Sequence, residues 1–117
     1  MKRKITKELL AEFKCCPEGI IQFNSYFPNG VVPTIKKALK VARPFNWYWP
    51  AKHLLSENSY QVWREEWREA FFAAADIMRD GKPDNEERYV VYLSEACAVS
   101  FVKAWDRDNF ILRKELP

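Results

Sequence analysis

The stretch YQVWREEWREAFFAAADIMRD, residues 60–80, decides the fold because its apolar residues recur with the period of an α-helix. Charged residues fill the positions between them, as on a helix with one buried face. Asn58 or Ser59 is suited to cap its start, and Gly81 followed by Pro83 marks its end. We therefore predict a long helix over about residues 60–80. Its apolar stripe, which we expect in the core, comprises Tyr60, Trp63, Trp67, Ala70, Phe71, Ala74, Ile77 and Met78.

A second long helix is predicted over about residues 85–105, after a capping-box pattern at residues 84–87. Its apolar residues run nearly all round the helix, which is typical of an element packed between others. The alternative is a strand at residues 89–93, where β-branched and aromatic residues cluster. Polar residues at 106–109 are expected to break the chain. Residues 110–116 then form a short helix or an edge strand, and periodicity does not decide between the two.

Shorter amphipathic segments precede these two helices. The predicted ranges are 5–13 with Thr6 as cap, a helix from Pro17 toward Phe27, about 34–42, and 47 to about 55 with Asn46 as cap. The fold class that follows is all-α. We expect a compact bundle of five to six helices, one domain over residues 1–117, in which the last two long helices form an antiparallel hairpin.

Composition limits the class of protein. A hydrophobic fraction of 48% and a charged fraction of 30% are those of an ordinary globular chain. No apolar run is long enough to span a bilayer, and no apolar segment follows the basic start at residues 1–4, so we expect a cytoplasmic protein without a signal peptide or a membrane partner. The three cysteines include the adjacent pair Cys15 and Cys16, which lacks disulfide or zinc-site spacing. They are predicted to be buried structural thiols.

The chain lacks the motifs of common active sites. There is no glycine-rich phosphate loop, no Gly-x-Ser-x-Gly turn and no His-Glu-x-x-His pair. The one histidine, His53, lies on the polar side of a short predicted helix, where a solvated side chain is expected. Glu65, Glu66 and Glu69 alternate with arginines on an exposed face. We therefore expect a protein that is not an enzyme, with no catalytic residues, no cofactor and no metal.

Aromatic residues outside the predicted stripes suggest a binding surface for another protein. Phe72 lies among charged residues of its helix, and Trp49 lies off the apolar face of the short helix that begins near Trp47. Aromatic residues dominate the binding energy of protein interfaces. The predicted partner-binding residues are Trp49, Phe72 and the neighbouring Tyr48. The competing interpretation is that another helix covers these rings. A homodimer is the further association that they would allow.

A basic helix face supports nucleic-acid binding as the second hypothesis. Lys36, Lys37, Lys40 and Arg43 share one side of the helix predicted around residues 34–43. With the preceding helix and the turn between them, this segment resembles a helix-turn-helix arrangement, and nearby aromatic residues are suited to stack on bases. The net charge of +3 is mild and the other charges are mixed, so an ordinary solvated face is the competing interpretation.

The first quarter of the chain also resembles a known group of proteins. The pattern is Ile5-Thr6-Lys7 with Leu10, then Cys16-Pro17-Glu18-Gly19, Phe23 and Phe27-Pro28-Asn29-Gly30. It is similar to the N-terminal pattern of small helical proteins from phages, prophages and bacteria. The resemblance implies no activity and no site residues. It implies a phage-type accessory protein, a class whose compact members often bind and block a host or viral protein.

Overall fold

The computed structural model of the chain describes residues 4–42, 46–79, 81 and 85–115, with side chains as far as Asn109. This described part contains six α-helices and no β-strand, which confirms the predicted all-α class. The chain divides into two compact units, Met1–Pro33 and Thr34–Pro117, each of which is described by itself. The single domain over residues 1–117 stays a prediction. Within the described residues, no helix combines the length and the apolar character needed to cross a bilayer.

The first unit contains α1 (Lys7–Glu12) and α2 (Pro17–Tyr26). Thr6 caps α1 as predicted, because its hydroxyl oxygen accepts a hydrogen bond from the Leu9 amide at 3.1 Å. Ile5 and Val31 exchange two backbone hydrogen bonds of 2.8 Å and join the two ends of the unit. Gly30 is required beside this bridge. Its φ is +78°, and an added Cβ would lie 2.8 Å from the Ile5 carbonyl oxygen.

The thiols differ from the prediction of three buried cysteines. Cys97 is buried in the second unit, but Cys16 is exposed and Cys15 is only partly covered. The prediction was wrong for this pair because Cys16 is the N-terminal flanking residue of α2, outside the face that Phe23 buries. One of the three thiols, that of Cys97, is therefore buried.

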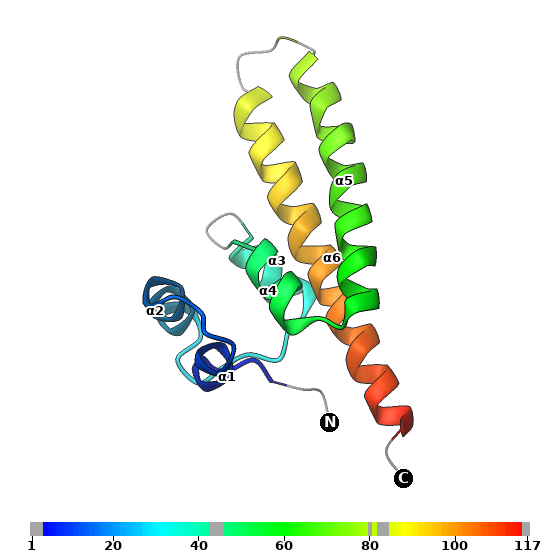
Figure 1. Cartoon of the computed structure of the whole chain (residues 1–117). Helices are drawn as coiled ribbons and strands as arrows, with labels where there is room; N and C mark the ends of the chain where they lie inside the picture. The colour runs from blue at the N-terminus through cyan, green and yellow to red at the C-terminus, as the bar shows by residue number, and fades with distance from the viewer. Residues whose placement is uncertain (1–3, 43–45, 80, 82–84, 116–117) are drawn as a thin grey trace. The chain divides into compact units, whose positions relative to one another are not determined.

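The second unit is organised by two long helices, α5 (Glu57–Arg79) and α6 (Asn85–Glu115). They run side by side in opposite directions, which confirms the predicted hairpin (Figure 1). The expected break at residues 106–109 is wrong, because α6 continues through them as a helix. Residues 89–93 are helical, as predicted for the helix over 85–105, and do not form the alternative strand. Residues 110–115 are therefore the last turns of α6.

The start of α5 also differs from the prediction, because Ser56 and not Asn58 or Ser59 precedes the first helical residue. The Ser56 hydroxyl accepts a hydrogen bond from the Ser59 amide at 3.2 Å. Asp108 of α6 completes this end of the helix, since its carboxylate accepts hydrogen bonds from the Ser56 amide and hydroxyl at 2.8 and 2.7 Å. Asp108, one of the polar residues that suggested a chain break, thus caps the neighbouring helix.

Two shorter helices, α3 (Ile35–Lys40) and α4 (Tyr48–Leu54), belong to the same unit (Figure 1). Ala38 and Ala42 form a buried cluster with Ala98 and Val102 of α6, against which Trp47 packs. Small side chains at these positions allow the backbones to approach closely. The apolar residues of this segment are not all buried, because Ile35 and Leu39 are exposed while the two alanines are covered.

The buried stripe of α5 is narrower than predicted. Its buried residues Ser59, Trp63, Ala70 and Ala74 span an arc of about 60° at 100° per residue. Placing Trp67, Phe71 and Met78 in the core was wrong, since all three are exposed. They follow one flank of the helix, beside the arc that packs on α6.

Candidate functional site

An aromatic groove lies in the second unit where α4, α5 and α6 meet. We define the aromatic groove by six of its lining residues: Tyr48, Lys52, Tyr60, Trp63, Arg64 and Trp67. Leu93, Ser94 and Cys97 of α6 contribute to its wall, and its volume is about 680 Å³. The α5 residues reach one groove because positions three and four apart share a helix flank.

Trp63 anchors the floor of the aromatic groove. It is 3% exposed, and its indole N–H donates a hydrogen bond of 3.1 Å to the Cys97 carbonyl oxygen. The ring of Tyr60 lies nearly parallel to it, with centroids 6.2 Å apart and planes at 19°. The Tyr48 ring approaches both, at 6.5 Å from Tyr60 and 6.4 Å from Trp63. A fixed indole with two phenol rings around it therefore forms the inner surface.

The charge in the aromatic groove is positive. Lys52 and Arg64 are the charged side chains among its described lining residues, and none of those residues is a carboxylate. The Lys52 ammonium lies 5.6 Å from the centre of the Tyr48 ring. The groove thus presents aromatic faces and positive charge together.

The pKa values of the two tyrosines of the groove are shifted mainly by the hydrogen bond between them. A hydrogen bond with Tyr60, and then the neighbouring Lys52, lowers the pKa of Tyr48 below its ordinary value. The same hydrogen bond raises the pKa of Tyr60. A phenolate at Tyr48 would accept the bond that the Tyr60 hydroxyl donates, so negative charge is favoured on Tyr48. This is the rim position of the groove, where Tyr48 is exposed.

A second aromatic feature continues along the outside of α5. We call Trp67, Phe71 and Phe72 the aromatic ridge. The ring centroids of Trp67 and Phe71 are 5.7 Å apart, and those of Phe71 and Phe72 are 6.1 Å apart. The exposed fractions are 37% for Trp67, 40% for Phe71 and 64% for Phe72. Trp67 belongs both to the ridge and to the groove, and so joins the two surfaces.

The predicted partner-binding residues are divided between different places. Phe72 is exposed, as its position among charged residues indicated, and Tyr48 is exposed at the groove. Trp49 is neither on the ridge nor in the groove lining. It is partly buried, and its ring stacks on His53 at 4.7 Å. His53 itself is exposed, as expected. Sequence reasoning missed Lys52, Tyr60, Arg64 and Trp67, because groove residues from separate helices share no local motif.

The basic face is present in part. Lys36, Lys37 and Lys40 are exposed on α3, opposite the side that carries Ala38, and Arg43 lies outside the described residues. The helix has six residues and ends at Lys40. Because α2 and α3 belong to different units, the helix-turn-helix arrangement stays a prediction.

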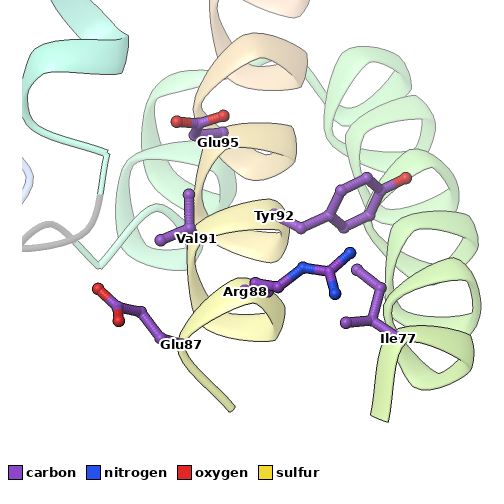
Figure 2. A pocket seen from close by; sticks show the side chains of 6 residues that line it. All are labelled: Ile77, Glu87, Arg88, Val91, Tyr92 and Glu95. Carbon is purple, nitrogen blue, oxygen red and sulfur yellow. The ribbon is translucent and has the colours of Figure 1, made fainter. Parts of the chain in front are cut away.

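A second hollow of about 450 Å³ lies between the last turns of α5 and the first turns of α6. In Figure 2, Arg88 and Tyr92 extend from α6 toward Ile77 of α5, while Glu87 and Glu95 point to the other side of α6. One cation and two carboxylates line this hollow, so it does not favour a ligand of one charge. The aromatic groove differs from it in both aromatic content and charge.

Metal-ligating residues are not gathered in the described part of the chain. No group of three histidine, cysteine, aspartate or glutamate side chains occurs there in positions to hold an ion. The groups that converge are aromatic rings, two phenols and two cations, which are suited to binding. Comparison of the chain with protein-family models, with curated proteins and with solved structures found no match.

Proposed function

We propose that the protein is a non-enzymatic interaction module of the cytoplasm that binds another protein through the aromatic ridge. The observation that carries the proposal is the exposure of three neighbouring aromatic rings on one helix, Trp67 stacked on Phe71 and Phe71 edge-to-face with Phe72. Phe72 lies about 180° from Trp63 around α5, so α6 cannot cover it by packing on the buried stripe. Contiguous exposed aromatic surface is typical of interaction sites, and aromatic side chains supply much of the binding energy there.

The N-terminal resemblance supports a more specific version of this proposal. The residues that carry the resemblance, from Ile5 to Gly30, all lie in the first unit, and the aromatic ridge lies in the second. We propose a phage-type accessory protein that acts by binding and blocking a host or viral protein. In this proposal the ridge is the contact surface, and no reaction is catalysed.

Nucleic-acid binding is the second candidate, and one observation favours it. Lys36, Lys37 and Lys40 are all exposed on α3, where phosphates could reach them. A phosphate binder loses affinity steeply as salt is added. Retention of DNA or RNA at low salt, lost on changing these lysines to glutamine, would place this candidate first.

The test of the proposed function is a comparison of variants in affinity capture from host lysate, followed by purification of the captured protein. The ridge variant combines Phe71→Ala and Phe72→Ala. The matched control is Tyr92→Ala, which removes an exposed ring from α6. We expect the wild type and the control to capture the same protein and the ridge variant to lose it, with all three melting at similar temperatures.

Two outcomes would overturn the proposal. One is equal affinity of the purified partner for the ridge variant and the wild type. The other is recovery of nucleic acid without protein. Light scattering of the purified chain tests whether it forms a homodimer. A dimer that the ridge variant dissociates would identify the partner as a second copy of the chain.

A further inference from the structure

Beyond protein docking, we infer that the aromatic groove binds a small planar anion, meaning a flat ring that carries a phosphate or carboxylate group. The inference concerns Tyr48, Lys52, Tyr60, Trp63 and Arg64, and does not depend on Phe71 or Phe72. The aromatic groove has a volume of about 680 Å³, which falls within the range of about 300–1,000 Å³ that small-molecule sites occupy.

The ring of such a ligand is recognised by the groove's aromatic faces. Trp63 is held in place by its hydrogen bond to the Cys97 carbonyl oxygen, so the floor does not need to be ordered on binding. Tyr48 and Trp67 are partly exposed at the rim, where a flat ligand gains contact area with each. Any planar ring can stack on an aromatic side chain, because stacking needs only a flat face.

The anionic group of the ligand is recognised by Lys52 and Arg64. Arg64 lies one turn from Tyr60 on α5, and Lys52 lies one turn from Tyr48 on α4, so the two cations approach the groove from different helices. The acidic residues nearest to Arg64 in sequence are Glu65 and Glu66, and neither is part of the groove lining. The Glu65 carboxylate lies 3.9 Å from the Arg68 guanidinium. The acidic residue nearest to Lys52 in sequence is Glu57. Its carboxylate accepts a hydrogen bond of 3.4 Å from Gln61 and is not part of the lining. Positive charge in the groove is therefore not neutralised by its lining.

The behaviour of Tyr48 agrees with this charge. The hydrogen bond with Tyr60 is the largest cause of the lowered pKa of Tyr48, and Lys52 and then Arg64 lower it further, so the two cations add to the stabilisation of a negative charge at the rim of the groove. A phosphate or carboxylate in the same place would experience the same two cations. Arginine and lysine are the side chains that recognise such groups in proteins.

Neither of the other two candidate surfaces combines these properties. The second hollow has mixed charge, because Arg88, Glu87 and Glu95 are all among its lining residues. The lysines of α3 are exposed on a six-residue helix and line neither hollow. Ring recognition and anion recognition meet in the aromatic groove.

The test uses the full chain with four probes: adenosine 5′-monophosphate, indole-3-carboxylate, neutral adenosine and inorganic phosphate. Calorimetry measures affinity, and the indole N–H signals in a ¹H–¹⁵N spectrum report the place. We expect at least one of the two planar anions to bind about tenfold or more tightly than adenosine or phosphate alone. Binding should shift the indole signals of Trp63 and Trp67 and leave that of buried Trp105 unchanged. Binding of adenosine 5′-monophosphate would indicate a nucleotide ligand, and binding of indole-3-carboxylate would indicate an aromatic carboxylate.

Matched variants test whether Lys52 and Arg64 bind the anionic group of the ligand. Lys52→Gln combined with Arg64→Gln should weaken binding by about tenfold or more, whereas Lys37→Gln on α3 should have no effect. All three positions are exposed, so the variants should melt like the wild type. Absence of binding by both anions, or equal binding by the double variant and the wild type, would overturn the inference. The Phe71→Ala, Phe72→Ala variant should retain ligand binding, which separates a failure of this site from a failure of the ridge.

Discussion

The Asp108 carboxylate accepts hydrogen bonds from both the amide and the hydroxyl of Ser56, 52 residues away in the sequence. It also accepts a hydrogen bond from the hydroxyl of Ser59, which is buried. A carboxylate at this place complements the positive N-terminal end of α5. One side chain of α6 therefore fixes where α5 begins and satisfies a buried hydroxyl.

Removing this carboxylate should destabilise the hairpin. We expect Asp108→Ala to lower the free energy of unfolding by about 2 kcal/mol, because it removes a helix cap and leaves the Ser59 hydroxyl without its acceptor. The matched control is Asp106→Ala on the same helix, for which we expect a change within about 0.5 kcal/mol. Urea unfolding followed by circular dichroism measures both. Equal losses for the two variants would show that Asp108 acts only through its charge on α6.

The same residues show why sequence analysis misplaced the end of α6. Aspartate and asparagine favour caps and turns when their side chains bond to the local backbone. Here Asp108 bonds to another helix, and the Asn109 side-chain amide donates to the Trp105 carbonyl oxygen at 2.7 Å within the helix. The partner of Asp108 is specified by tertiary structure, and the bond of Asn109 is made one turn back along α6, so neither side chain ends the helix. Local pattern therefore predicted the existence of α6 and its start, but not its length.

Two phenylalanines should respond very differently to truncation. Phe101 is 2% exposed and lies between Trp47 and Trp105, with ring centroids at 5.6 and 6.1 Å. We expect Phe101→Ala to cost about 3–5 kcal/mol of stability, because the core around it cannot close the cavity. Phe72→Ala should change stability by less than about 0.5 kcal/mol. Thermal and urea unfolding of both variants provide the comparison. A large loss for Phe72→Ala would make this ring part of the core and remove the basis of the ridge.

The two tryptophans of α5 provide a third comparison. Trp63→Phe removes a buried indole and its hydrogen bond to Cys97, for which we expect a loss of about 2 kcal/mol. Trp67→Phe keeps a ring at a partly exposed position and should cost less than about 0.5 kcal/mol. Denaturant unfolding measures both. Similar costs for both substitutions would mean that the two rings are equally buried in solution.

The helical pattern predicts the same environment for both tryptophans, and there is a physical reason why it does. The 3.6-residue period places Trp63 and Trp67 on one side of α5, and a helix surrounded by others would bury both. The part of α5 that packs on α6 uses the small residues Ala70 and Ala74, so the buried arc is narrow. Periodicity gives the face of a helix but not how many neighbours cover it. The groove could not be predicted from the sequence for the same reason, because its residues come from three helices whose packing the pattern does not give.

The buried thiol of Cys97 makes stability depend on pH in the alkaline range. Burial raises the pKa of Cys97 from 9.0 to about 11 in the folded protein. The folded state therefore holds the thiol proton more tightly than the unfolded state. Its contribution to stability is complete below pH 9 and is lost as the pH rises toward 11, because the unfolded chain alone gains from ionisation there. By pH 11 the loss amounts to about 2 kcal/mol.

The measurement compares urea unfolding of the wild type and Cys97→Ala at pH 8 and pH 11. Tyrosines and lysines titrate in both proteins, so their effects cancel in the difference. We expect the stability advantage of the wild type at pH 8 to shrink by about 2 kcal/mol at pH 11. Val102→Ala is the control, because it truncates a buried side chain of α6 that carries no titratable group, and its difference from the wild type should be the same at both pH values. An advantage for Cys97 that stays constant with pH would show that water reaches this thiol in the folded protein, and that the α5–α6 contact beside Trp63 is looser than the hydrogen bond at Cys97 indicates.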